Sequence, residues 1–395
     1  MKTLLRQSHP VGRILILITT LTFGGAETQV SRLATELRRR GWAVKVVCMT
    51  DPDAFVEQLE AEDVEVTSLG MPRGVPDPRA VWRLRRIVQA FKPDIVHAHM
   101  VHANLLGRIA RLFCRMPALI CTAHNLRESS EKGGGTWHKE LLYRMTDSLA
   151  DRTTIICKAA FDRYVKVGAV PAGRFELIPN GVDTSRFRPS MEAREVERRV
   201  LHIGNQFVWL AVGRLVEQKD YSTLLQAIQQ LTGQEWLLLI AGDGPLAAEL
   251  QAEANRLKVD HRVRFLGARE NIQRLYNAAD ALVMSSKYEG LSVALLEAAS
   301  AGLPCVVTDV GGNGEAVLHE VTGYVVPPAD SAGLAAAMQK LQDLPPEERR
   351  SLGHAARHHC VSNFCFDKVA DQWIELYARY MPERCAKDRD MAVKS

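Results

Sequence analysis

Two glutamates eight residues apart carry the strongest chemical signal in this sequence. Glu289 and Glu297 lie in the run YEGLSVALLE at 288–297, which follows the apolar stretch Ala281–Met284. The pattern predicts a strand, a small turn in which Gly290 permits close backbone approach, and then a helix. At helical rise the two carboxylates lie at most roughly 12 Å apart, so they could accept hydrogen bonds from different hydroxyl groups of one elongated ligand. Taken alone, the pair is better explained as part of a solvated helix face, and only its context favours a ligand site.

The same segment offers sites for phosphate, and two cations accompany it. The backbone N–H groups of Leu291 and Ser292 stand at the expected helix start, where unpaired N–H groups bind anions. Arg214 follows Gly213 at the end of another expected strand, and Lys219 comes shortly after it. A bidentate arginine and a mobile lysine charge suit a diphosphate. The alternative is an ordinary loop with surface cations.

Glycine-rich turns end two further expected strands. One contains Gly242 and Gly244 in the run GDGP at 242–245, and the other is the run GGNGE at 311–315. Turn chemistry alone explains both runs. Their position matters more, because they follow the carboxyl ends of expected strands, at the same edge of the expected sheet as Arg214 and the two glutamates.

Short aliphatic runs alternate with amphipathic helical patterns along the chain, which is typical of parallel sheets covered by helices. In the first half we expect strands at 13–19, 43–49, 64–67, 94–97, 118–122 and 153–157, with helices such as Ala26–Arg40, Arg79–Phe91 and Asn104–Phe113. In the second half we expect strands at 207–213, 236–241, 262–266, 281–285, 304–307 and 323–326, and a last helix at Phe366–Tyr380. The fold class is therefore α/β, with two Rossmann-like halves whose ligands bind beyond the carboxyl ends of the strands.

Length and composition agree with two globular domains. The chain has 395 residues, 47% of them apolar, and a formal charge of +4, which favours anionic partners in general. The charged stretch Glu192–Arg199 interrupts the rhythm, and we place the domain linker there. The apolar run Ile14–Ile18 is too short for a membrane span and lacks a cleavage site, so we interpret it as a buried first strand rather than a signal peptide.

Cysteines and histidines give little sign of a metal site. The eight cysteines include no Cys-x-x-Cys pair, which favours a reducing cytosol. The cluster His358-His359-Cys360 lacks a second ligand pair at zinc spacing, and we interpret it as the end of a helix. Asp51-Pro52-Asp53 has the form of a metal-binding motif, but a turn is the better interpretation.

The motifs together resemble the retaining glycosyltransferases of family 4, which have the GT-B fold of two Rossmann-like domains facing across a cleft. The resemblance covers roughly residues 11 to 380. It rests on Gly24-Gly25-Ala26-Glu27, Thr122-Ala123-His124-Asn125, Ile178-Pro179-Asn180-Gly181-Val182-Asp183, Gly213-Arg214-Leu215 with Lys219, Gly242-Asp243-Gly244-Pro245 and the glutamate pair, in that order.

The resemblance implies a role for each matching residue. Residues 1–188 would form an acceptor-binding domain, residues 200–360 a sugar-nucleotide-binding domain, and residues 361–385 a helix that braces the two. Arg214 and Lys219 would hold the donor diphosphate, Glu297 the ribose and Glu289 the transferred sugar, while His124 would contact that sugar near the reacting centre. The remaining donor contacts would come from Gly24, Gly25, Asn180, Gly213, Gly242, Gly244, Gly290, Leu291 and Ser292. We expect His97 and His99 to line the cleft or to be structural.

The reaction implied is transfer of a hexose with retention at the anomeric carbon, with the departing phosphate as the acceptor of the proton. We expect no cofactor and no metal, because the cations supply the charge that Mg²⁺ would otherwise supply. Two departures from the family pattern, Asp220 where glycine is usual and Asn125 in place of an acid after His124, put fine donor geometry in doubt. A UDP-sugar is the default donor, and a GDP-sugar stays open.

The acceptor is left open by the sequence; a saccharide or lipid-linked saccharide of a cell-surface polysaccharide or glycolipid is expected, and nucleic acid is not. Two helices carry basic and apolar residues together: Arg83, Arg85 and Arg86 with Trp82, and Arg108, Arg111 and Arg115 with Phe113. They could dock a cytoplasmic protein on the anionic inner face of the membrane, or simply be the polar faces of helices packed on a sheet. The glycine-rich run 129–135 predicts a mobile loop at the cleft mouth.

Two rivals from other classes stay open. A sugar-nucleotide 2-epimerase shares this fold and ligand but should carry a dedicated acid/base constellation. A non-catalytic sugar-nucleotide-binding protein would not need the charged residues along the rim. Turnover with an acceptor separates a transferase from both.

Overall fold

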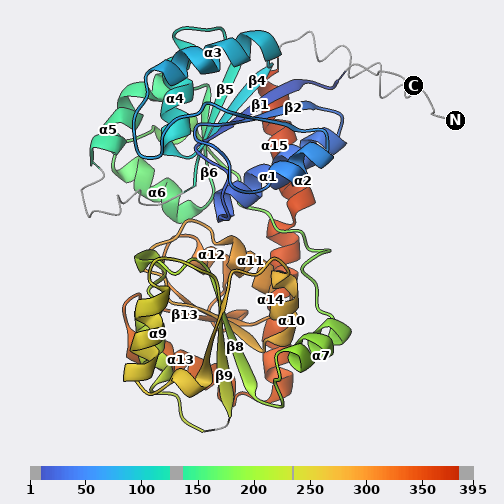
Figure 1. Ribbon diagram of the computed structural model, residues 1–395, viewed down its shortest axis with the longest axis vertical. Helices are drawn as coiled ribbons and strands as arrows, with labels where there is room; N and C mark the ends of the chain where they lie inside the picture. The colour runs from blue at the N-terminus through green and yellow to red at the C-terminus, as the bar shows by residue number, and fades with distance from the viewer. Residues whose placement is uncertain (1–9, 125–136, 234, 382–395) are drawn as a thin grey trace, which may run out of the picture. The chain divides into compact units, whose positions relative to one another are not determined.

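The computed structural model describes residues 10–124, 137–233 and 235–381, and it has two parallel sheets, each accompanied by helices (Figure 1). The α/β class expected from the sequence is confirmed. Contacts divide the chain into two compact units, the first holding residues 1–156, 161–178 and 370–395, and the second holding residues 157–160 and 179–369. The expected run 129–135 and Asn125 lie outside the described residues.

The sheet of the first unit has seven parallel strands among the described residues, in the order β3-β2-β1-β4-β5-β6-β7. The central strands are buried over their whole length, because helices cover parallel sheets on both faces and apolar runs can therefore fill them. The strands are β1 (Arg13–Ile18), β2 (Ala43–Cys48), β3 (Glu65–Ser68), β4 (Ile95–His99), β5 (Ala118–Ala123), β6 (Arg152–Ile155) and β7 (Phe175–Leu177).

The helices of the first unit connect these strands. They are α1 (Gly25–Arg39), α2 (Val56–Ala61), α3 (Arg79–Phe91), α4 (Val101–Arg111), α5 (Trp137–Thr146) and α6 (Lys158–Lys166), the last of which begins within the second unit. Helix α15 (Phe366–Tyr380) is also divided, since from Ala370 onward its residues belong to the first unit.

The sheet of the second unit has six parallel strands among the described residues, in the order β10-β9-β8-β11-β12-β13. They are β8 (Phe207–Val212), β9 (Trp236–Ala241), β10 (Val263–Gly267), β11 (Ala281–Met284), β12 (Cys305–Thr308) and β13 (Gly323–Val326). The helices are α7 (Met191–Val200), α8 (Tyr221–Ile228), α9 (Ala247–Arg256), α10 (Ile272–Ala278), α11 (Val293–Ser300), α12 (Asn313–Ala316), α13 (Ser331–Asp343) and α14 (Pro346–Phe364).

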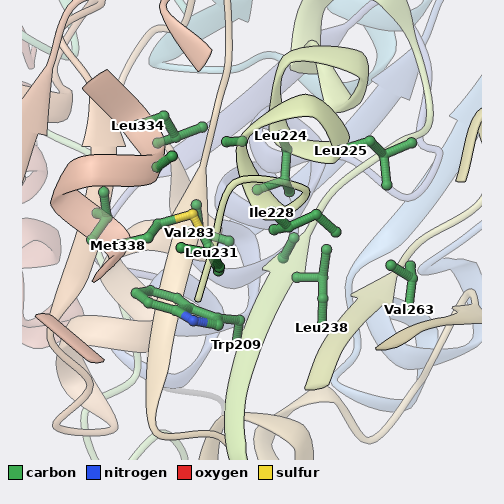
Figure 2. Close-up of a cluster of buried hydrophobic side chains, with 14 of the residues drawn as sticks. Trp209, Leu224, Leu225, Ile228, Leu231, Leu238, Val263, Val283, Leu334 and Met338 are labelled. Atoms are coloured by element: carbon green, nitrogen blue, oxygen red, sulfur yellow. The ribbon is translucent and has the colours of Figure 1, made fainter. Parts of the chain in front are cut away.

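The core of the second unit forms where α8 and α13 cover one face of this sheet (Figure 2). Leu224 and Ile228 are one helical turn apart on α8, and both point toward the buried strand residues Trp209 and Leu238. Leu334 and Met338 have the same spacing on α13 and are fully buried. Each such side chain contributes about 1.5–3 kcal/mol through burial, so this face stabilises the packing of α8 and α13 on the sheet of the second unit.

Two elements differ from the sequence-based expectations. The stretch Glu192–Arg199, where we placed a linker, forms most of helix α7, which has no buried residue but is held by Arg194 and Arg198 to Asp280. Strand β7 was not expected, because three residues with one buried side chain leave no periodic signal. Strand β3 is also poorly buried, although a strand was expected at 64–67.

Candidate active site

The strand order of the second unit places its candidate residues at one point of the sheet. Strand β8 lies between β9 and β11, so the chain direction of the connections reverses between β8 and β11. In open α/β sheets ligands bind beyond the strand carboxyl ends at such a switch point. The loop after β8 carries Arg214 and Lys219, and the loop after β11 carries Glu289.

Three predicted glycines pack the strand-end loops against one another. The backbone N–H of Gly213 donates to the carbonyl of Ala241 (3.1 Å), and that of Leu215 donates to the carbonyl of Asp243 (2.9 Å). A Cβ atom on Gly242 would overlap the Gly213 carbonyl, and one on Gly244 would overlap the backbone of Leu215. These glycines are therefore required for the close approach of two loops, whatever they contact in a ligand.

Lys219 and Glu289 lie together, whereas Arg214 extends into solvent. The Lys219 Nζ lies 2.6 Å from Glu289 Oε1, and Ser286 Oγ donates to the same oxygen at 2.7 Å. The side chains of Lys219 and Glu289 are only 17% and 8% exposed, so neither charge could stay buried there without the other. Ser286 was not among the predicted residues, because in the sequence it carries no signal apart from its position in the loop after β11.

The backbone conformation at Asp220 explains why the family pattern usually has glycine at this position. It adopts the left-handed conformation (φ 49°, ψ 47°), which favours glycine over residues with a side chain. The carboxylate makes a local contact, in which Thr223 donates to Oδ2 at 2.8 Å. The main-chain carbonyl of Asp220 accepts a hydrogen bond from Ser285 Oγ at 2.9 Å. The departure at Asp220 thus keeps the turn that positions Lys219.

The start of α11 is tied down from two sides. Asn180 Nδ2 donates to the carbonyl of Leu291 at 2.7 Å, and the N–H of Gly312 donates to the carbonyl of Gly290 at 2.6 Å. These contacts use carbonyl oxygens, and the first N–H groups of a helix have no partner within the helix, so the start of α11 can offer N–H donors to an anion. Asn180 therefore acts in this structure by holding the loop.

Glu297 lies on α11 and is buried to 8% exposure. Tyr276 on α10 donates its hydroxyl toward Glu297 Oε2 at 3.1 Å. A buried carboxylate held by a tyrosine has a fixed direction, which suits recognition of a hydroxyl group. Tyr276 carried no signal in the sequence, where it reads as one more aromatic residue of a helix.

The remaining candidates, Gly24, Gly25 and His124, belong to the first unit. Gly24 precedes α1 and makes room for the carboxylate of Glu27, while Gly25 is exposed at the helix start. His124 follows β5, and its Nε2 lies 2.9 Å from Nδ1 of His99 on β4. Burial lowers the pKa of His124 to about 4, so the ring is neutral at pH 7.

Several alternative sites find ordinary structural explanations. Asp51 accepts a hydrogen bond from Ser68, and Asp53 pairs with Arg73, as expected of a turn. Cys360 is buried within α14, near the end of that helix. Across residues 10–124, 137–233 and 235–381 no group of three or more histidine, cysteine, aspartate or glutamate side chains could hold a metal ion. Over the same ranges, no helix is both long and apolar enough to cross a membrane.

Family models match both halves of the chain. Residues 23–186 match the model described as Glycosyltransferase Family 4, and residues 193–359 match that of the Glycosyl transferases group 1. Among similar proteins, the glycogen synthase of Mycobacterium tuberculosis is 31% identical over 399 residues, covering 90% of this chain and 91% of the relative. The UDP-Gal:alpha-D-GlcNAc-diphosphoundecaprenol alpha-1,3-galactosyltransferase of Escherichia coli is 28% identical over 313 residues, covering 77% of this chain and 80% of the relative.

Solved structures show the same fold. The Anabaena protein Alr3699/HepE, in complex with UDP-glucose, superposes with a TM-score of 0.81 at 25% identity, covering 93% of this chain and all of the other. The sucrose-phosphate synthase of Thermosynechococcus elongatus superposes with a TM-score of 0.80 at 23% identity, covering 93% and 98% of the two chains.

Fold and site together define a glycosyltransferase with the GT-B fold. The chain belongs to the group 1 glycosyltransferases of family 4, as the resemblance predicted.

Proposed function

We propose that this glycosyltransferase moves a hexose from a UDP-sugar to a hydroxyl acceptor with retention of the anomeric configuration. The acceptor we propose is a saccharide or lipid-linked saccharide of a cell-surface polysaccharide or glycolipid. The UDP-glucose complex of the Anabaena protein and the UDP-Gal donor in the name of the Escherichia coli relative support this choice of donor.

The observation that carries the proposal is the arrangement at the β8/β11 switch point. Exposed Arg214, the Lys219 ammonium group paired with Glu289, and the N–H groups at the start of α11 lie on one rim of one sheet and offer hydrogen-bond donors to an anion. A diphosphate that leaves the sugar gains negative charge, and preorganised cations and N–H dipoles lower the energy of that state. The rim therefore suits a nucleoside diphosphate leaving group, and we propose that it works without a metal.

Glu289 is better suited to binding hydroxyl groups than to attacking the sugar. Its Oε1 accepts from Lys219 and Ser286, which weakens the carboxylate as a nucleophile. Its second oxygen can still accept a sugar hydroxyl. We propose that the acceptor oxygen bonds to the anomeric carbon on the face from which the diphosphate leaves. The bond from that carbon to the diphosphate breaks, and a phosphate oxygen takes the acceptor's proton.

Glu297 is proposed to bind the ribose hydroxyls, and His124, Gly24 and Gly25 to make the other donor contacts that the resemblance implies. Glu297→Gln keeps an oxygen for Tyr276 but removes the charge. Because hydrogen bonds to charged groups contribute about 1.5–3 kcal/mol, we expect the Kd for UDP to rise at least about tenfold without loss of folding.

Thermal unfolding against UDP-, GDP-, ADP- and dTDP-sugars tests the donor site, since a ligand that binds the folded state raises the melting temperature. The matched control is Glu253→Gln, because Glu253 is equally buried in the same unit and accepts from Ser222. A UDP-dependent shift that falls in Glu297→Gln but not in Glu253→Gln supports the proposal. Equal shifts in both variants would contradict the ribose role, and no shift with any donor would contradict the donor site.

Product analysis separates the reaction from its rivals. Incubation with the donor and a lipid-linked saccharide should give a product with the anomeric configuration of the donor, also in the presence of EDTA. Formation of an epimer without an acceptor would identify the isomerase instead. Inverted products would overturn the retaining mechanism.

A surface of the first unit supports contact with an anionic membrane. Trp82 on α3 packs against Phe113, which follows α4, with ring centroids 5.4 Å apart, and both side chains are about half exposed. The guanidinium of Arg85 lies 5.4 Å from the centroid of the Trp82 ring. Arg86, which follows Arg85, and Arg115, which lies shortly after Phe113, are both exposed. Aromatic rings with basic neighbours suit a lipid headgroup region.

The structure corrects the extent of this basic surface. Arg108, which the sequence placed on the basic face, is fully buried and pairs with Asp147. Arg83 pairs with Asp77 and Arg111 with Asp151. Only Arg85, Arg86 and Arg115, of the six arginines considered, form no ion pair among the described residues, and we define them with Trp82, Leu112 and Phe113 as the α3/α4 patch.

A further inference from the structure

Behind His124 lies a continuous row of hydrogen-bonded side chains within the first unit. His99 Nδ1 is 2.9 Å from His124 Nε2, and His99 Nε2 is 3.2 Å from His97 Nδ1. His97 Nδ1 is also 2.7 Å from the hydroxyl of Tyr377, and His97 Nε2 is 2.6 Å from Oγ1 of Thr122. Tyr377 comes from α15, so the row joins the end of the chain to its first half.

The row is buried and uncharged. His97 and His99 are at most 2% exposed, and Trp373 of α15 lies with its ring centroid 4.7 Å from that of His97. Burial lowers the pKa of all three histidines below the usual range. Each ring therefore carries a single proton, and its position on Nδ1 or Nε2 is set by the hydrogen bonds.

Tyr377 determines where the first proton sits. Among the described residues its buried hydroxyl has His97 Nδ1 as its hydrogen-bond partner, and a buried O–H without an acceptor costs about 1–3 kcal/mol. Tyr377 therefore donates to His97 Nδ1, and His97 carries its proton on Nε2. That proton is donated to Thr122, whose hydroxyl in turn can donate to Thr154 Oγ1 at 2.7 Å.

The remaining positions follow from the same reasoning. The single lone pair of His97 Nδ1 accepts the Tyr377 proton, and the His99 ring packs against the His97 ring with centroids 3.9 Å apart. His99 Nε2 lies 3.2 Å from this unprotonated nitrogen and is favoured as an N–H, because a lone pair there would face the electron-rich side of the His97 ring. His99 Nδ1 is then an acceptor and receives the Nε2 proton of His124. His124 Nδ1 is left as a bare acceptor, and this buried nitrogen has no partner among the described residues.

We propose that Tyr377, His97 and His99 are positioning residues that hold His124 as its Nε2–H tautomer, so that Nδ1 accepts a hydrogen bond from a hydroxyl of the substrate. This inference rests on the proposed function, in which His124 contacts the transferred sugar. A fixed acceptor contributes to the rate, because a ring with the wrong tautomer would present a proton to another proton.

Tyr377→Phe tests the proposal, because it keeps the ring and removes the hydroxyl that orients the row. The proton positions can then reverse along the row, and we expect His124 to populate both tautomers. The kcat for sugar transfer should fall about tenfold, with the donor KM within about twofold. The matched control is Tyr143→Phe, which removes an equally buried hydroxyl, the acceptor for Asn104 Nδ2, from the same unit.

Two readouts make the outcome decisive. In protein labelled with ¹⁵N-histidine, assigned with His124→Gln, the His124 signals should show a proton on Nε2 and none on Nδ1. A proton on Nδ1 in the wild-type protein, or the same kcat in Tyr377→Phe as in Tyr143→Phe, would overturn the proposal. The NMR readout needs no substrate. A wild-type protein with the expected tautomer and no transfer from any nucleotide sugar would therefore refute the proposed function instead.

Discussion

Arg214 is the candidate residue whose substitution should affect activity with the least effect on stability. Its guanidinium is exposed, and it makes no side-chain hydrogen bond or ion pair within the described part of the chain. We expect Arg214→Ala to lower kcat/KM by about 100-fold, since removal of one preorganised charge-stabilising group typically costs that much. The free energy of unfolding should change by less than about 0.5 kcal/mol.

The control for Arg214→Ala is Arg350→Ala, an exposed arginine of α14 that pairs loosely with Glu347. Steady-state kinetics and urea unfolding on both variants check the prediction. Undiminished transfer by Arg214→Ala would remove the diphosphate role from this residue, whereas an equal loss in both variants would point to a general charge effect.

The buried histidines make stability sensitive to acid. The pKa of His124 falls from 6.5 to about 4 on folding, because burial disfavours the charged ring. Between these values the unfolded chain binds more protons, so stability is complete above about pH 6.5 and is lost as the pH falls toward 4. His124 alone accounts for up to about 3 kcal/mol of this loss.

Urea unfolding at pH 7.5, 6 and 5 measures this dependence. His124→Gln should reduce the slope of unfolding free energy against pH, because one titrating group is removed. Tyr143→Phe should lower stability by the same amount at each pH, since it removes no group that titrates in this range. Equal slopes in the wild type and in His124→Gln would show that His124 does not titrate as its burial requires.

At the scale of elements, the turn between β8 and α8 has a backbone conformation that its sequence does not favour. Asp220 is left-handed there, and its carboxylate interacts with Thr223 and Lys287. Asp220→Gly and Asp220→Ala both remove the carboxylate, but only alanine keeps a Cβ. We expect Asp220→Ala to be about 1 kcal/mol less stable than Asp220→Gly, as measured by chemical unfolding. Equal stabilities would mean that the turn relaxes to another conformation.

The strands and long helices were predictable because their signals are local. The central strands of both sheets are buried, mostly apolar runs, and helices such as Arg79–Phe91 and Phe366–Tyr380 show a complete amphipathic period. Strand β7 could not be recognised in the same way because it has only three residues, and helix α7 could not because it is highly charged and buries none of its residues. Helix α7 is held by arginine contacts to Asp280, which lies more than 80 residues away in the sequence.

The motifs of the candidate site could be predicted from the sequence, but the residues that contact them could not. Position at strand ends was enough to group Arg214, Lys219 and Glu289 before any geometry was known. The contacts of Ser286 and Tyr276 depend on how loops and helices meet, and the sequence contains no measure of that. Arg108 is an example of this limit. Its spacing on α4 is typical of a solvated helix face, but in the structure it is buried and pairs with Asp147, which lies far from it in the sequence.

At the scale of the whole molecule, a net charge of +4 is too small to bind an anionic membrane by itself, so any binding must come from a local surface. The α3/α4 patch supplies three arginines beside exposed aromatic and aliphatic side chains. Each arginine near an anionic bilayer contributes about 1 kcal/mol, and rings that enter the headgroup region add apolar burial. The patch should therefore bind vesicles that contain phosphatidylglycerol, and bind them less as salt rises.

Sedimentation with vesicles of phosphatidylcholine alone, or mixed with phosphatidylglycerol, measures this binding. Arg85→Glu/Arg86→Glu should lower the partition coefficient for the anionic vesicles by more than about tenfold, because four units of charge change at the surface. The matched control, Arg256→Glu/Arg350→Glu, makes the same charge change at exposed positions of α9 and α14. If both double variants lose binding equally, the attraction is a property of net charge, and the two helices only cover their sheet. If the patch variant alone loses binding but keeps transfer to a water-soluble acceptor, the patch brings the enzyme to lipid-linked acceptors without taking part in the reaction.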